Sequence, residues 1–367
     1  MEIKAAVLHE VGEQFSVQAV ELAAPAADEV VVEIAGAGIC HTDLAVKAGH
    51  LPFPLPGVLG HEGSGTVVAV GANVTSVSAG DKVAISFNSC GDCTQCGKGA
   101  PAYCLRFMEY NFGGVRADGS SAVAEAGKPL GSNFFGQSSL ATHAIAHVRN
   151  VVKLPDDVPI ELAGPLGCGI QTGAGAVMNS LYVEAGASLV VAGAGAVGLA
   201  AVLAAVVREA AFIIVVEPHE TRRKLALDLG ATHAIDPSAG PVAEQIRAIV
   251  PEGVEYAIDT TAVVSVLEQL LASLGARGTL GLIGVPANPE AVLPVALIPA
   301  VLQGLTVRGI TEGDADPQIF IPYILDLYRR GKFPFDKLIS TMPMSEINEA
   351  VAAQQRGDVV KVVLTTQ

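Results

Sequence analysis

Three short segments carry side chains that could share one metal ion. Cys40-His41-Thr42-Asp43 places a thiol, an imidazole, a hydroxyl and a carboxylate in a single turn, and Gly60-His61-Glu62-Gly63 follows about twenty residues later. Cys168 lies between two further glycines, ahead of a helix-like run, where a thiol readily becomes a thiolate. A single Cys is most often a small buried hydrophobic residue, so each segment alone is weak evidence. Together they make a shared metal centre the hypothesis to test.

The other four cysteines lie in one loop with the pattern Cys90-x2-Cys93-x2-Cys96-x7-Cys104. Four thiolates suit tetrahedral Zn²⁺ and leave no coordination position for a substrate, so the loop predicts a structural zinc. An iron–sulfur cluster also uses four Cys, but no Pro follows Cys104 and the spacing fits neither ferredoxin pattern. The acidic composition of the chain disfavours a zinc module that binds nucleic acid.

From Ser188 onward the apolar pattern alternates between short strands and helices. Leu189–Ala192 is typical of a buried parallel strand, and a Gly-rich turn joins it to a predicted helix at Leu199–Arg208. The next strand, Phe212–Val216, leads to an acidic residue nineteen positions beyond the last glycine of the turn. This context predicts dinucleotide binding, with the pyrophosphate at the helix N-terminus and the carboxylate on the ribose. The residues expected at the cofactor here are Gly193, Gly195, Val197, Gly198 and Glu217.

The elements that must position these residues predict an α/β protein with two kinds of architecture. The first 90 or so residues are β-rich, whereas the region from 188 to 285 repeats the strand–helix units of a doubly wound parallel sheet. Early strands are predicted at 3–8, 30–34, 65–70 and 82–85, between Gly, Pro and Asp residues. Later strands are predicted at 255–259, 279–285 and 359–364, and helices at 221–229, 263–274 and 317–330.

Composition excludes several classes of protein. With 37 acidic and 22 basic side chains, the net charge of −15 argues against nucleic acid and anionic membranes as partners. No basic-then-apolar leader follows Met1, so we expect a cytoplasmic protein with reduced or metal-bound cysteines. An uncharged run between Glu184 and Arg208 is long enough to span a bilayer. Its three central glycines disfavour a single helix and favour a strand, a turn and a helix.

These motifs together resemble the zinc-dependent medium-chain alcohol dehydrogenases over essentially the whole chain. Within that family, residues 111–114, 134–139 and 311–314 are most similar to bacterial aryl- and allylic-alcohol dehydrogenases of the benzyl alcohol and geraniol type. The resemblance implies a GroES-like β-rich catalytic domain at 1–169 and 312–367 around a Rossmann NAD-binding domain at 170–311. It also implies a homodimer or homotetramer that transfers a hydride between NAD and a primary aromatic or allylic alcohol.

The resemblance also assigns roles to single residues. It implies a catalytic zinc with one open position, held by Cys40, His61 and Cys168. It makes Glu62 a group that can approach the metal and Asp43 the acceptor that orients the imidazole. Thr42 would bridge the substrate hydroxyl and the nicotinamide ribose. The other residues that match cofactor-binding positions of the family are His41, Thr172, Arg222, Ile283, Val285 and Lys361.

The sequence departs from the family at one position. Many relatives end the proton relay in a His five residues beyond the first zinc Cys, where this chain has Ala45. His41, His50 or water are the candidates for that terminal role. Alternative functions are a dehydrogenase of aliphatic alcohols, a non-catalytic NAD-binding relative and a zinc-independent quinone or enone reductase. The last two are disfavoured because all the catalytic zinc ligands are present.

Overall fold

The computed structural model describes residues 1–366 and divides into two compact units. The β-rich unit consists of Met1–Gly169, Ala315–Asp326 and the chain from Ile339 onward, and the parallel-sheet unit consists of Ile170–Asp314 and Leu327–Leu338. Residues 327–338, which we expected in the catalytic domain, pack within the parallel-sheet unit.

The β-rich unit contains two sheets. In spatial order, the strands of the first sheet are β4 (Gly57–Val58), β1 (Glu2–Leu8), β2 (Ser16–Leu22), β7 (Val123–Glu125) and β8 (Lys128–Pro129). Those of the second are β10 (Val151–Lys153), β6 (Lys82–Ile85), β5 (Gly63–Val70), β3 (Glu29–Gly38), β18 (Lys361–Thr365) and β17 (Ile339–Pro343), with β9 (His143–His147) also paired to β3.

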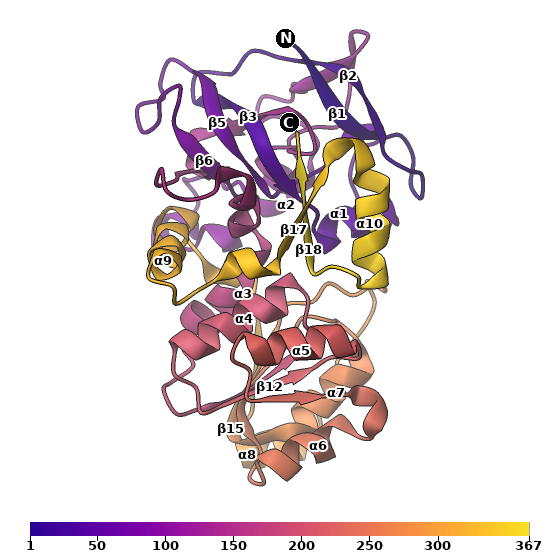
Figure 1. Ribbon diagram of the computed structural model, residues 1–367, viewed down its shortest axis with the longest axis vertical. Coiled ribbons are helices and arrows are strands. Elements are labelled where there is room, and N and C mark those ends of the chain that lie inside the picture. The colour runs from indigo at the N-terminus through magenta and orange to yellow at the C-terminus, as the bar shows by residue number, and fades with distance from the viewer. Residues whose placement is uncertain (367) are drawn as a thin grey trace. The chain divides into compact units, whose positions relative to one another are not determined.

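Strand β3 pairs with β5, β9 and β18 and contributes to both cores of this unit. Its side chains alternate between two separate hydrophobic cores, with Val30, Val32 and Ile34 in one and Val31 in the other. The helices that accompany the sheets are α1 (His41–Lys47), α2 (Phe107–Phe112), most of α9 (Pro317–Arg329) and α10 (Ile347–Arg356), the last lying beside β17 and β18 (Figure 1). The end of β3 is therefore held firmly where the chain enters α1.

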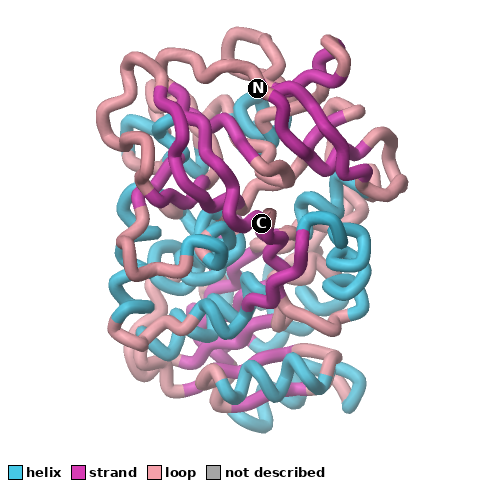
Figure 2. The backbone as a smooth tube through the Cα atoms, turned by 45° about the horizontal axis from the view of Figure 1, so that its top comes forward, coloured by secondary structure: helices cyan, strands magenta, loops and turns pink. Residues whose placement is uncertain are grey.

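The parallel-sheet unit has six parallel strands, in the spatial order β13 (His233–Ile235), β12 (Phe212–Val216), β11 (Ser188–Ala192), β14 (Val254–Asp259), β15 (Leu274–Leu282) and β16 (Thr306–Gly309). Helices flank the strands (Figure 2), namely α3 (Gly169–Gly175), α4 (Ala196–Val207), α5 (Glu220–Asp228), α6 (Val242–Ile249), α7 (Val264–Ser273) and α8 (Leu297–Gln303). The strand order reverses next to β11, which is the switch point where doubly wound sheets bind nucleotides.

Most predicted elements are present, with shifted boundaries. Strands at 82–85 and 212–216 match, whereas the helix predicted from Leu199 already begins at Ala196 because Gly195 serves as its N-cap. The uncharged run at 184–208 forms β11, a turn and α4, as expected. Among residues 1–366, no helix combines the length and apolar character needed to cross a bilayer. Sequence analysis missed short or weakly patterned elements, including β2, β13, β16, α6 and α8.

Candidate active site

Cys40 and His61 are brought together by two neighbouring strands. β3 and β5 pair in antiparallel orientation, with Ala37 opposite Gly63. The residues just after β3 and just before β5 therefore meet at the same end of the sheet. Cys40 follows the end of β3 by two residues, and His61 precedes the start of β5 by two residues.

Cys168 joins this cluster from a distant part of the sequence. The hydroxyl of Ser86, just beyond β6, donates a hydrogen bond of 2.6 Å to the carbonyl of Gly167 and so fixes the residue before Cys168. The two Sγ atoms and a ring nitrogen of His61 all lie within 4.8 Å of one another. None of the three residues is more than 8% exposed. The structure thus brings the three predicted ligands together.

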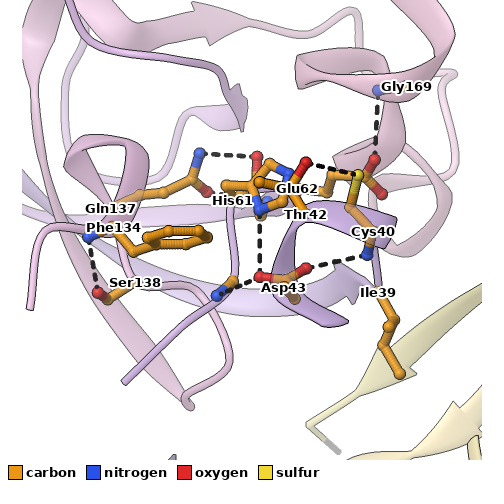
Figure 3. Close-up of polar contacts among 12 residues, drawn as sticks. Ile39, Cys40, Thr42, Asp43, His61, Glu62, Phe134, Gln137, Ser138 and Gly169 are labelled. Carbon is orange, nitrogen blue, oxygen red and sulfur yellow. Dashed lines mark hydrogen bonds and ion pairs between the residues drawn. The ribbon is translucent and has the colours of Figure 1, made fainter. Parts of the chain in front are cut away.

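The buried carboxylate of Asp43 organises the cluster. One oxygen accepts the main-chain N–H of Cys40 at 2.9 Å, and the other accepts that of Gly60 at 3.0 Å. The second oxygen also lies 3.1 Å from Nδ1 of His61 (Figure 3). Because Asp43 occupies Nδ1, Nε2 is the ring nitrogen left for the cluster. The contact is the one that the predicted orienting role of Asp43 requires, and the role itself stays a prediction.

A zinc ion fits this arrangement. Nε2 of His61 is buried and has no hydrogen-bond partner among the described residues, and an orphaned buried polar atom needs an explanation. A metal ion shared with the thiolates of Cys40 and Cys168 would satisfy it. Two thiolates and one imidazole are also a known donor set for zinc sites that keep a fourth position open.

The surroundings of the cluster favour an ionised thiolate beside a positive charge. A hydrogen bond from Cys168, together with the charges of His61 and Lys361, lowers the pKa of the Cys40 thiol well below its usual value against the opposing effect of burial. Burial alone would lower the pKa of His61. The charges of Asp43 and Cys40, with hydrogen bonds to the same two residues, together overcome it, so that this pKa is raised well above its usual value. The site is therefore suited to holding a cation.

Glu62 forms a buried ion pair and is not one of the three clustered groups. Nζ of Lys361 donates to its two oxygens at 2.9 and 2.8 Å and to the carbonyl of Ile39 at 2.9 Å. The main-chain N–H of Gly169 adds a bond of 3.2 Å. Burial raises the pKa of Glu62, although the charge of Lys361 opposes it. A Cβ at Gly38 would collide with this carboxylate, so glycine is required there.

The residues of α1 that could carry a proton differ in exposure. Thr42 is half-buried, with its Oγ1 3.8 Å from Sγ of Cys40, whereas His41 is exposed. Ala45 is buried, and its carbonyl accepts the main-chain N–H of His50 at 2.8 Å. The main chain of His50 is thus adjacent to Ala45, the position where the family pattern has a relay His. The side chain of His50 is exposed.

The four-Cys loop forms a second cluster in the same unit. The Sγ atoms of Cys90, Cys93, Cys96 and Cys104 lie within 4.8 Å of one another, and all six cysteines of the described chain are free of disulfides. Main-chain hydrogen bonds from Cys96 and Leu105 lower the pKa of Cys93 to about 6. Burial raises the pKa of Cys104 to about 12. Four sulfur donors in this geometry fit a closed tetrahedral zinc site.

The Gly-rich turn in the parallel-sheet unit has the geometry of a pyrophosphate site. Gly193 has a φ of +93°, and a Cβ on Gly198 would collide with the carbonyl of Gly193, so both positions require glycine. Gly195 is the N-cap of α4, and Val197 lies half-buried in its first turn. The N-terminus of this twelve-residue helix carries main-chain N–H groups and a partial positive charge that suit phosphate.

Glu217 is buried at the end of β12. Its two carboxylate oxygens accept the main-chain N–H groups of Ala194 at 2.8 Å and His219 at 2.9 Å. Each oxygen has a further lone pair with which it can accept a ribose hydroxyl. Nearby, the guanidinium of Arg223 donates to the carbonyl of Glu217 at 2.7 Å and pairs with Asp236 at 3.0 Å. That guanidinium is therefore already engaged.

The remaining predicted cofactor residues are spread over the parallel-sheet unit. Oγ1 of Thr172 donates to Oε2 of the buried Glu312 at 3.4 Å, and the main-chain N–H of Ile283 donates to the carbonyl of Asp259 at 3.0 Å. Arg222 is half-buried and Val285 is exposed. Their contact with a cofactor stays a prediction.

Sequence analysis did not identify Phe135 and Gln137 as parts of the site. The amide of Gln137 accepts the main-chain N–H of Gly63 at 3.0 Å and donates to the carbonyl of His61 at 2.9 Å. The ring of Phe135 stacks on the imidazole of His61. The segment 134–139 stood out only through the family resemblance, because contacts across more than 70 residues leave no local pattern.

Comparison with known proteins identifies the family. Residues 26–156 match the alcohol dehydrogenase GroES-like domain, and residues 196–328 match the zinc-binding dehydrogenase domain. The chain is 50% identical over 363 residues to the geraniol dehydrogenase of Castellaniella defragrans, covering 98% of this chain and 97% of that protein. The chain therefore belongs to the zinc-binding alcohol dehydrogenases, and the predicted family, enzyme class and GroES-like plus Rossmann fold are confirmed.

Solved structures agree with this assignment. The benzyl alcohol dehydrogenase of Acinetobacter calcoaceticus matches with a TM-score of 0.97 at 43% identity, covering 100% of both chains. A zinc-binding dehydrogenase of Sinorhizobium meliloti 1021 bound to NADP matches at 25% identity with a TM-score of 0.83, covering 100% of this chain and 99% of that one. A short chain alcohol dehydrogenase of E. coli CFT073 complexed with NADH matches at 25% identity with a TM-score of 0.82, covering 99% of both.

Proposed function

We propose that this enzyme interconverts primary aromatic or allylic alcohols and their aldehydes, with NAD as the hydride carrier and a catalytic zinc held by Cys40, His61 and Cys168. The observation that carries the proposal is the buried, unpartnered Nε2 of His61 beside two thiols. The substrate class is supported by the geraniol and benzyl alcohol dehydrogenases, which match the chain over nearly its full length. A second, structural zinc belongs to the four-Cys loop.

The division of labour in the site follows from its contacts. When bound, zinc supplies a Lewis acid that lowers the pKa of a coordinated alcohol toward neutrality. NAD⁺ supplies the hydride acceptor. The chain orients the ligands. Asp43 fixes the imidazole of His61, and Glu62 and Lys361 neutralise each other's charge next to the site. The hydroxyl of Thr42, close to Cys40, accepts the substrate proton and passes it on.

The electrostatics around Glu217 support NAD over NADP. A 2′-phosphate would be repelled by this buried carboxylate. Sequence analysis raised Arg222 and Arg223 as groups that could bind the phosphate instead. Arg223 is engaged with Asp236 and with the main chain of residue 217, which weakens that alternative. Equal efficiency of the enzyme with both cofactors would refute the assignment.

The parallel-sheet unit supports a homo-oligomer through a second copy of the chain. β16 is the edge strand of the sheet and all its residues are exposed, while Leu297, Ile298, Val301 and Leu302 of α8 are each 73–81% exposed. An open strand edge can pair with the same edge of a second copy about a two-fold axis, and exposed apolar side chains such as those of α8 favour burial in an interface. Leu302→Lys should shift the mass measured by light scattering toward the monomer, and Ile319→Lys, an equally exposed apolar position on α9, should not.

One assay panel with metal analysis tests the function. Benzyl, cinnamyl, terpenoid and short aliphatic alcohols are each offered with NAD⁺ and with NADP⁺. We expect the highest kcat/KM for an aromatic or allylic alcohol with NAD⁺, and about two zinc ions per chain, one for each cluster. A preference for short aliphatic alcohols would favour the alternative substrate class, and one zinc or none would contradict the proposed centre.

A further inference from the structure

The segment from Asn133 to Ser138 has an unusual backbone. Asn133, Phe135 and Ser138 have φ angles of 58°, 50° and 54°, in the left-handed region that residues other than glycine rarely adopt. Such conformations cost free energy and persist only where surrounding contacts impose them. The side chains of this segment are also buried. The contacts that hold it are therefore informative about its role.

Those contacts lead to the chain around His61. Oγ of Ser138 donates to the carbonyl of Val58 at 2.6 Å, and the main-chain N–H of Ser139 donates to the carbonyl of Gly60 at 3.0 Å. The amide of Gln137 bonds the main chain on both sides of Glu62, and Figure 3 shows Phe134 and Gln137 beside His61. The segment thus clamps the stretch that carries the ligand.

Two consecutive rings of the segment pack on the imidazole itself. The ring of Phe135 stacks on its face, with centroids 4.4 Å apart and planes inclined by 24°. The ring of Phe134 meets it edge-on at 5.3 Å and 82°. Asp43 holds Nδ1 at 3.1 Å, which leaves the imidazole free to tilt about that bond unless its face is covered.

We infer that Phe135 is a positioning residue for the zinc ligand His61, an inference that rests on the proposed zinc site. The flat face of Phe135 limits the tilt of the imidazole and keeps Nε2 directed at the position shared with Cys40 and Cys168. The left-handed backbone conformation of Phe135 is retained because it places the phenyl ring on the imidazole of His61. Loss of a partner that hydrogen-bonds a metal ligand typically costs about 10- to 100-fold in metal affinity, and we expect loss of a stacked ring to fall at the lower end of that range.

The chain offers a matched control. Phe112 belongs to the same aromatic cluster, with its ring centroid 5.1 Å from that of Phe135 and 5.5 Å from that of Phe134. Its ring makes no stacking or edge contact with His61 among those the described residues show. Replacement of Phe112 therefore disturbs the cluster without uncovering the imidazole.

The test compares zinc release from the wild-type enzyme, F135M, F135L and F112M to a chromogenic chelator. Met conserves most of the core volume but has no flat face, so F135M should fold. The single zinc of H61A provides the reference release rate for the four-Cys site. The absorption spectrum of the cobalt-substituted enzyme reports the ligand geometry independently of activity.

We expect F135M and F135L to release the catalytic zinc roughly ten-fold faster than the wild type and to change the cobalt spectrum. The four-Cys zinc should leave at its reference rate in every variant, and F112M should match the wild type at both sites. Wild-type release rates and spectra in both Phe135 variants would overturn the positioning role alone. A wild-type enzyme holding only the four-Cys zinc would instead overturn the proposed zinc site on which the inference rests.

Discussion

The β-rich unit contains two sulfur-rich clusters that are built in opposite ways. The four-Cys loop collects its ligands from a stretch of fifteen residues, and two of its cysteines are only half-buried. The other cluster takes Cys40, His61 and Cys168 from three distant segments and buries all of them. The first can form wherever its loop closes, whereas the second forms only when the sheet is complete.

The difference separates stability from chemistry. Four sulfurs would close the coordination sphere of a zinc ion in the loop, so that such an ion could only hold the chain together. Three ligands would leave one position of a zinc ion open, and the contacts made by Asp43, Glu62 and Phe135 fit a site in which the orientation of the ligands matters. We therefore expect the two clusters to respond differently to substitution.

The largest effect is expected from His61→Ala or Cys168→Ala. Each variant should lose one zinc per chain and at least about 10³-fold in kcat, because a Lewis acid worth several kcal/mol is removed. NAD⁺ affinity, measured by fluorescence titration, should change little. An active Cys168→Ala enzyme would disprove the ligand assignment.

Thr42→Ala should lower kcat by about 10²–10⁴-fold with both zinc ions retained, because the first hydroxyl of the proton path is lost. Thr42→Ser keeps that hydroxyl and should remain within a few-fold of the wild type. The comparison is made with steady-state kinetics and metal analysis. If the Ala and Ser variants turn over alike, the proton leaves by another route.

Cys96→Ser should affect stability rather than chemistry. Loss of the loop zinc should lower Tm by about 10 °C, the size expected when a structural metal is lost from a domain of this kind. The catalytic zinc should stay bound, and activity at low temperature should be largely kept. Retention of two zinc ions by this variant would contradict the four-Cys site.

The smallest effect concerns how the free energy of unfolding depends on pH below neutrality. Burial lowers the pKa of His147 to about 4, and the charge of Arg149 contributes further. The guanidinium of Arg149 also donates to the carbonyl of Ser89, next to the four-Cys loop, at 3.1 Å. Below the ordinary His pKa of about 6.5, His147 is protonated in the unfolded chain but stays neutral in the folded chain. Stability is therefore lost as pH falls from about 6.5 to 4.

His147→Gln should remove this loss, which amounts to ~1–2 kcal/mol after a discount for the partial exposure of the ring. Urea unfolding at pH 7 and pH 4.5 measures it. The free energy of unfolding should fall less between these two pH values in the variant than in the wild type. An identical change in the free energy of unfolding for both proteins would show that His147 is not responsible.

The two clusters also differ in how far the sequence predicts them. The four-Cys site can be recognised from the sequence because the close spacing of its cysteines alone predicts a shared metal ion. Glycines and strand periodicity likewise predict β11, the turn and α4, since these depend on neighbours in sequence. The residue types raise a shared site for Cys40, His61 and Cys168 only as a hypothesis. The family resemblance made it specific, because the shared position depends on strand pairing and on segments more than 100 residues apart.

Other features had no local signal at all. The ion pair of Glu62 and Lys361 joins residues 299 positions apart, and the amide of Gln137 reaches His61 across 76 positions. α8 escaped prediction because its apolar residues are exposed rather than arranged on one buried face. What the sequence could not provide is therefore mainly tertiary contact.

The pairing of β18 with β3 has a consequence for biosynthesis. Residues 363–365 bond to the last part of β3, and Lys361 reaches the carbonyl of Ile39 across 322 positions. During translation, Cys40, His61 and Cys168 all leave the ribosome long before this strand exists. Until β18 is synthesised, the last part of β3 has an unpaired edge next to the three predicted zinc ligands, and Glu62 lacks its ion-pair partner Lys361. A chain stalled before residue 361 would thus carry every zinc ligand yet hold the metal poorly, so ribosome-bound intermediates should acquire the loop zinc first.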